Sequence, residues 1–282
     1  MPRFALHLFG TLIFATCVGM EALGAETPVE RGRYLVNSIM ACGNCHTPQG
    51  PNGPVTEKFL SGGIRFDEPP FDVTASNITP HRTSGIGKWT DAEIGRAIAD
   101  GVRPNGVPLA PVMPSAFYKA LTKEDLNAVV AYLKTVRPQD GRVSEPVYRV
   151  SLPPMTIPGV KPMSSAELND KIARGHYLAT IGHCMECHTP MKEGRHDFNL
   201  MGKGGRDFPG PWGVSMSANI SSHPTAGIGA WTDAEIKRAI TKGIGRDGRK
   251  LKPPMAYAYY AKMTEADLDA MVAWLRTVKP AE

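Results

Sequence analysis

The chain has 282 residues, of which 42% are hydrophobic and 21% are charged, and its formal net charge is +5. This composition is ordinary for a soluble globular protein, and the length suggests two domains or one large one. No run of five Lys or Arg residues occurs, which disfavours a nucleic-acid-binding surface.

Residues 1–25 have the plan of a secretory signal peptide. Arg3 gives a positive start, Phe4 to Val18 is mostly apolar, and Ala22 to Ala25 supplies small residues for cleavage. The apolar run is short for a membrane span, and no later stretch stays apolar for about 18 residues. Cys17 follows Thr16 rather than a small residue, so we do not expect a lipid-anchored cysteine. We therefore expect export to the periplasm.

The remainder of the chain is a tandem duplication, because most related positions are separated by 142 residues. The segments 77–79 and 85–94 return as 219–221 and 227–236. We expect two domains, residues 26–140 and 166–282. Residues 141–165 between them are rich in proline, which favours a semi-rigid extended linker.

Helix signals recur in both halves in the same order. Thr90 with Glu93 forms a capping-box pattern, apolar residues follow at helical spacing, and Gly101 ends the helix. Between the first cysteine pair and Asn77 we expect loop, with short strands as the alternative. Gly32 in the first helix permits a close crossing with the last helix of its repeat. The expected helices lie around residues 31–38, 90–101 and 122–133, and around 166–180, 232–243 and 264–275 of the second repeat.

Two motifs carry the chemistry, Cys42-Gly43-Asn44-Cys45-His46 and Cys184-Met185-Glu186-Cys187-His188. A Cys-x-x-Cys-His run is the attachment sequence of haem c: the thiols add to two haem vinyl groups, and the His binds the iron. A redox dithiol or half of a zinc site are the other interpretations. Two motifs in a duplicated chain favour two covalent haems.

A second iron ligand must come from later in each repeat. Met113 and Met255 are the one methionine pair related by the 142-residue offset, and each lies 71 residues after the first cysteine of its motif. A thioether ligand raises the reduction potential of the iron. Both methionines are also ordinary core candidates.

His81 and His223 share the same offset and would instead make a bis-His haem of lower potential. We prefer to interpret them as polar loop residues. The other histidines outside the two motifs, His176, His183 and His196, have no partner in the first repeat, and we expect them at the surface.

Trp89 and Trp231 stand at a helix entry in both halves. They are candidates either for a haem wall or for ordinary core residues.

In the residues described above, both repeats resemble class I cytochrome c domains. More narrowly, they are similar to the multihaem cytochrome c subunits of bacterial periplasmic dehydrogenases for alcohols, gluconate and related substrates. By that resemblance, Met113 and Met255 match the axial ligands of the family. The shared motifs are Thr47-Pro48 and Thr189-Pro190, Gly62-Gly63 and Gly204-Gly205, Asn-Ile-Thr/Ser, Gly-Ile-Gly-x-Trp-Thr-Asp-Ala-Glu-Ile and Pro-x-Met.

The sequence thus predicts a mainly α protein of two tandem class I cytochrome c domains joined by a proline-rich linker. The expected function is electron relay by a periplasmic dihaem cytochrome, from a dehydrogenase to a respiratory oxidase or another cytochrome. The expected haem-binding residues are Cys42, Cys45, His46, Met113, Cys184, Cys187, His188 and Met255. The alternative is a dihaem enzyme, either a peroxidase or a sulfur-compound dehydrogenase, which would need an exchangeable iron position.

Overall fold

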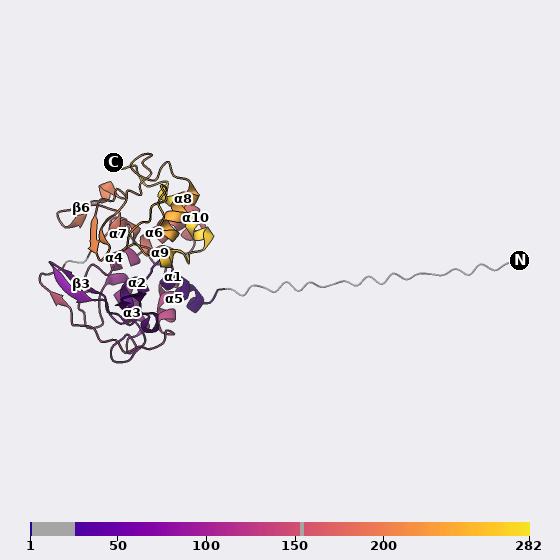
Figure 1. Ribbon diagram of the computed structural model, residues 1–282. Coiled ribbons are helices and arrows are strands. Elements are labelled where there is room, and N and C mark those ends of the chain that lie inside the picture. The colour runs from indigo at the N-terminus through magenta and orange to yellow at the C-terminus, as the bar shows by residue number, and fades with distance from the viewer. Residues whose placement is uncertain (2–25, 153–154) are drawn as a thin grey trace.

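The computed structural model describes Met1, residues 26–152 and residues 155–282. The expected signal peptide, with Cys17, lies outside the described residues except for Met1. The two repeats form neighbouring groups of helices: the first runs from indigo to magenta in Figure 1 and the second from orange to yellow.

Both repeats contain the same five helices in the same order. In the first they are α1 (Pro28–Asn37), α2 (Gly43–His46), α3 (Asp91–Asp100), α4 (Ser115–Tyr118) and α5 (Lys123–Leu133). In the second they are α6 (Lys171–Ile181), α7 (Cys184–Cys187), α8 (Asp233–Lys242), α9 (Tyr257–Tyr260) and α10 (Glu265–Leu275). Helix α6 begins later than expected, because Asp170 caps it and residues 167–169 form a separate 3-10 turn.

The cap residues act as the sequence predicts. Thr90 accepts a hydrogen bond from the Glu93 amide, and the Glu93 carboxylate accepts one from the Thr90 amide. Gly101 ends the helix with a left-handed φ of 66°, a conformation that costs glycine little. The same arrangement recurs at α8, with Thr232, Glu235 and Gly243, so α3 and α8 begin and end in the same way.

The first and last helices of each repeat cross at a glycine. A Cβ atom on Gly32 would lie 1.9 Å from the carbonyl oxygen of Ala128, and one on Gly175 would lie 1.9 Å from that of Ala270. No side chain fits in that space, so α1 packs directly on the backbone of α5, and α6 on that of α10. The predicted helix crossing is confirmed in both halves.

The stretch after each cysteine motif contains short hairpins where the sequence predicted loop. In the first repeat the strands are β1 (Gln49–Gly50), β2 (Gly53–Pro54), β3 (Arg65–Glu68) and β4 (Phe71–Thr74). In the second they are β6 (Met191–Lys192), β7 (Arg195–His196), β8 (Asp207–Gly210) and β9 (Gly213–Met216). Strands of two to four residues are too short for an alternating pattern to reveal them.

Residues 141–152 are packed on the first repeat. They contain β5 (Val147–Tyr148), which pairs with β4 so that Tyr148 lies opposite Phe71. Further along, the amide of Met163 donates to the carbonyl of Ala120. The expected semi-rigid linker is therefore, in part, a third strand of the first repeat's sheet.

A reciprocal set of hydrogen bonds joins the two repeats. Tyr34 of α1 donates to the Asp267 carboxylate of α10 at 2.5 Å, and Tyr177 of α6 donates to the Asp125 carboxylate of α5 at 2.6 Å. Each aspartate also binds an arginine of its own repeat. The hydrophobic core continues across this contact, because one cluster of buried residues draws members from both halves. We call the four residues of the two tyrosine–aspartate hydrogen bonds the Tyr–Asp clasp: Tyr34, Asp267, Tyr177 and Asp125.

Candidate functional site

A cavity of about 2790 Å³ lies between the helices and hairpins of both repeats. Its volume exceeds the roughly 300–1,000 Å³ of sites for drug-sized ligands. It is therefore large enough for more than one bulky group. All eight predicted haem-binding residues line it, namely Cys42, Cys45, His46, Met113, Cys184, Cys187, His188 and Met255.

Each cysteine motif forms one short turn of helix at the cavity wall. The chain enters the first motif through Ala41 with a φ of 47° and the second through His183 with a φ of 42°. Left-handed backbone is unfavourable for residues other than glycine, and such strain is found preferentially at functional sites. The same strained position precedes the first cysteine in both repeats.

The histidines of the two motifs are held in one tautomer. Nδ1 of His46 lies 2.7 Å from the carbonyl oxygen of Ser76, and Nδ1 of His188 lies 2.7 Å from that of Ala218. A carbonyl only accepts hydrogen bonds, so each Nδ1 must carry a proton. In the neutral ring Nε2 is then unprotonated, and its lone pair can bind a metal. Burial lowers the pKa of both imidazoles, which favours this neutral form.

The four motif cysteines are free thiols that line the cavity. Burial raises the pKa of Cys42 to about 12, that of Cys45 to about 11, and that of Cys187 to about 12. A catalytic dithiol needs a lowered thiol pKa, so this environment does not suit a redox-active pair. The donor set of two thiols beside one oriented imidazole fits covalent haem in each repeat.

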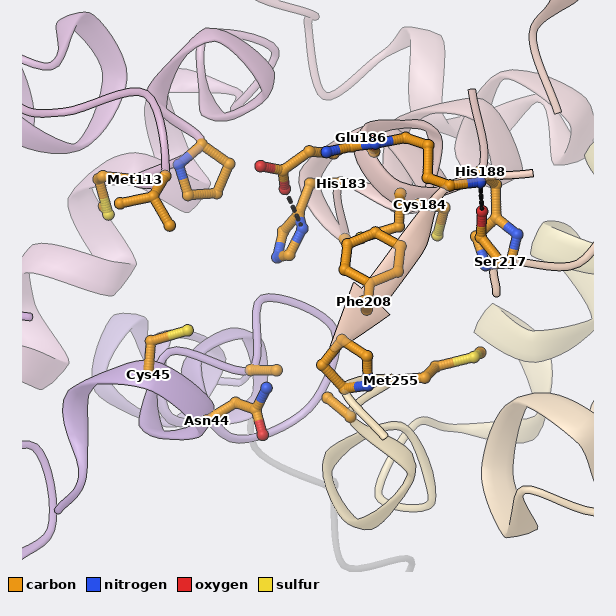
Figure 2. A pocket seen from close by; sticks show the side chains of 18 of the residues that line it. Asn44, Cys45, Met113, His183, Cys184, Glu186, His188, Phe208, Ser217 and Met255 are labelled. Carbon is orange, nitrogen blue, oxygen red and sulfur yellow. Dashed lines mark hydrogen bonds and ion pairs between the residues drawn. The ribbon is translucent and has the colours of Figure 1, made fainter. Parts of the chain in front are cut away.

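Met113 and Met255 reach the same cavity from equivalent tight turns. Ser115 donates its amide to the carbonyl of Met113 at 2.8 Å, and Tyr257 does so to Met255 at 3.0 Å. Figure 2 shows Met113 and Cys45 around one part of the cavity, and Met255 and His188 around another.

The rival ligands His81 and His223 are not among the cavity-lining residues. Nδ1 of His81 accepts the amide of Ser84 at 3.3 Å, and Nδ1 of His223 accepts that of Ala226 at 3.0 Å. Each ring is thus engaged with its own loop, as expected of a polar loop residue.

Sequence reasoning missed several cavity residues. Tyr118 and Tyr260, five residues after the two methionines, are buried and line the cavity, and the 142-residue offset was a signal that could have found them. His183 was expected at the surface, but it lines the cavity and pairs with Glu186 at 2.9 Å. His196 also lines it and contacts the carbonyl of Glu186. Neither histidine has a counterpart in the first repeat, so no repeat signal existed for them.

Trp89 and Trp231 also line the cavity, as expected of wall residues. Both indoles pack against the main hydrophobic core as well. The two interpretations of these residues are therefore compatible, because one side chain contacts both the core and the cavity.

The model of the cytochrome c family matches residues 29–137 and again residues 172–279. The chain belongs to the cytochrome c family. This cytochrome has one family domain in each repeat, which agrees with the tandem organisation, and the family implies covalently bound haem c.

Its relatives include cytochrome subunits of dehydrogenases. The cytochrome is 32% identical over 97% of its length to the fructose dehydrogenase cytochrome subunit of Gluconobacter japonicus. It is 30% identical over 86% of its length to the gluconate 2-dehydrogenase cytochrome c subunit of Pantoea cypripedii. It spans 57% of the length of each of these two relatives. A diheme cytochrome c-type protein of Cereibacter sphaeroides is 28% identical over 86% of the chain and is itself covered to 83%.

Proposed function

We propose that this cytochrome carries two covalent haems and relays electrons from a dehydrogenase to a respiratory acceptor. Cys42, Cys45 and His46 would hold one haem, with Met113 as the second iron ligand. Cys184, Cys187, His188 and Met255 would hold the other. Each haem, when bound, supplies an iron that takes up and releases one electron.

The observation that carries this proposal is the placement of both His–Met pairs on one cavity, with both imidazole tautomers set for metal binding. The carbonyls of Ser76 and Ala218 orient the rings and raise their basicity as ligands. Trp89 and Trp231, together with Tyr118 and Tyr260, give the cavity an aromatic lining.

A dihaem enzyme is the alternative, and it would need an exchangeable position at one iron. A methionine from each repeat on the cavity wall favours the carrier instead. Carbon monoxide binding to the reduced protein separates the two: we expect none at neutral pH, and stable binding would favour the enzyme.

The setting of the relay is also part of the proposal. Relatives that are subunits of fructose and gluconate dehydrogenases support a dehydrogenase as the electron donor. We place the protein in the periplasm, with an oxidase or another cytochrome as acceptor, on the strength of residues 1–25. None of the helices in residues 26–152 and 155–282 combines the length and apolar character needed to cross a membrane.

Intact-mass spectrometry of the protein exported from its host tests haem attachment and cleavage together. We expect a mature chain that begins near Glu26 and is heavier by the mass of two haems. Spectroelectrochemistry should then show two one-electron steps, and substrate should reduce the cytochrome only when the partner dehydrogenase is present. A mass increase of one haem or none would contradict the proposal.

A further inference from the structure

The second cysteine motif is surrounded by ionisable side chains that the first motif lacks. Four residues line the cavity around it, and we call them the second-motif cluster: His183, Glu186, His196 and Arg206. The positions 142 residues earlier hold no ionisable side chain; they are Ala41, Asn44, Pro54 and Ile64. Both repeats offer the same His–Met pair of candidate iron ligands, so any difference between the two iron sites arises from their surroundings.

One carbonyl of the second motif is held by two side chains of the cluster. Nε2 of His196 lies 2.8 Å from the carbonyl oxygen of Glu186, and Nη1 of Arg206 donates to the same oxygen. The guanidinium is therefore fixed beside the second motif. Burial, followed by the charge of Glu186, raises the pKa of the Cys187 thiol to about 12, and Arg206 opposes this shift. The other three motif thiols show no effect of Arg206.

The carboxylate of Glu186 extends from the second motif into the cavity, where it pairs with His183 at 2.9 Å (Figure 2). The His183 ring meets Tyr118 of the first repeat edge to face, with the ring centres 6.1 Å apart. Tyr118 in turn donates to the carbonyl of Met40, two residues before the first motif, at 3.4 Å. Two side chains thus connect the carboxylate to the first motif.

The segments that lead into the two motifs are also in contact. A Cβ atom on Gly182 would lie 2.6 Å from Cδ1 of Ile39. Gly182 lies two positions before the second motif and Ile39 three positions before the first, so the two segments pack directly on each other. The charge of Glu186 accordingly reaches the other repeat: burial and then this charge raise the pKa of the Cys45 thiol to about 11.

We propose that Glu186 and Arg206 give the two haems different reduction potentials, so that the first repeat receives the electron and the second passes it on. A nearby carboxylate favours ferric iron and lowers the potential, and Glu186 acts on both sites. The guanidinium acts in the opposite sense and at the second site alone, which leaves the second potential the higher.

The proposed step is simple in its balance. One electron leaves the iron of the first repeat, and the ferric iron of the second repeat takes it up, with no proton or bond exchanged. The direction of this transfer rests on the proposed function, whereas the arrangement of the two charges does not.

Spectroelectrochemical titration of the full holoprotein at pH 8, above the range in which histidine changes charge, measures both potentials. Met113→His and Met255→His assign each step to its repeat. At a fixed potential, Glu186→Gln should raise the ratio of ferrous to ferric iron about tenfold in both repeats, which is about 59 mV for a one-electron couple. Glu282→Gln makes the same charge change at an exposed residue that does not line the cavity, and should shift neither potential. A shift confined to the second haem, or an equal shift in the control, would overturn the proposal.

The guanidinium is tested separately. Arg206→Gln should lower the second potential alone, again by about tenfold in the ratio of ferrous to ferric iron, and so narrow the gap between the two haems. Arg206→Lys retains the charge and should keep the gap. An unchanged second potential in Arg206→Gln, or a wild-type protein whose first potential is the higher, would contradict the proposal.

A converse variant keeps the test open if Glu186→Gln fails to fold. Asn44→Glu places a carboxylate at the equivalent position of the first motif, on the same cavity. It should lower the first potential, with the ratio of ferrous to ferric iron falling about tenfold, and an unchanged potential would count against the proposal. Haem content and the presence of two one-electron steps in the wild type report on the proposed function instead.

Discussion

Tyr177 in the second repeat donates a hydrogen bond to Asp125 in the first at 2.6 Å, and both side chains are buried. Arg31 binds the same carboxylate through two nitrogens at 2.8 Å. Asp125 is also the third residue of α5, near the positive end of the helix dipole. The carboxylate therefore has a full set of donors only when the two repeats are docked.

Removing one hydroxyl of the Tyr–Asp clasp should loosen that docking. We expect Tyr177→Phe to lower the free energy of unfolding by about 1.5–3 kcal/mol, because a hydrogen bond to a charged group is lost in a buried place. Thermal unfolding measures the loss. Tyr132→Phe is the matched control, since among the described residues its hydroxyl accepts a hydrogen bond from Asn37 of the same repeat and makes none to the second repeat. An equal loss of unfolding free energy in the control would show that the clasp stabilises the protein no more than a hydrogen bond within one repeat.

The double variant Tyr34→Phe/Tyr177→Phe should go further and divide unfolding into two transitions. With both clasp bonds lost, each repeat would keep its own helix crossing but lose the hydrogen bonds that tie it to the other repeat, and only the shared apolar contact would remain. Calorimetry should resolve two peaks in place of one. A single sharp transition would mean that the shared apolar core alone couples the repeats.

Gly32→Ala should destabilise the first repeat by about 1–3 kcal/mol, the usual cost of overpacking a close contact. The added methyl would overlap the carbonyl of Ala128, and separation of α1 from α5 is the only relief. Gly95→Ala is the control in the middle of α3, where a Cβ meets Leu126 at an ordinary 3.6 Å. Higher helix propensity should make that variant equal to or more stable than the wild type.

Ligand identity can be tested one repeat at a time. Met113→His and Met255→His should each lower one reduction potential and remove one thioether-to-iron absorption band. His81→Ala and His223→Ala should change neither the potentials nor the band, because both rings bond within their own loops. The reverse pattern would establish bis-His ligation.

The parts predicted well from the sequence are those encoded locally. The cap at Thr90 depends on residues within one helical turn, and the crossing at Gly32 depends on a small residue that recurs in both repeats. The 142-residue offset selected Met113 and Met255 among thirteen methionines, and the structure places both on the cavity.

The parts that were missed depend on which surfaces meet in space. Tyr34 and Asp267 are 233 residues apart, and no periodicity shows which face of α1 turns toward the other repeat. Strand β5 lies in a proline-rich stretch whose composition favours an extended chain but does not reveal its partner. His183 carries no repeat signal, and its place on the cavity follows from the packing of the two halves.

The Tyr–Asp clasp has a consequence for how the duplicated chain arose. Each repeat presents both a tyrosine and the aspartate that a neighbouring tyrosine needs, so the surface is complementary to itself. Self-complementary patches are those that build two-fold symmetric dimers. A single-domain ancestor with this tyrosine and aspartate had the contacts for a homodimer, and fusion of two copies would preserve that interface inside one chain.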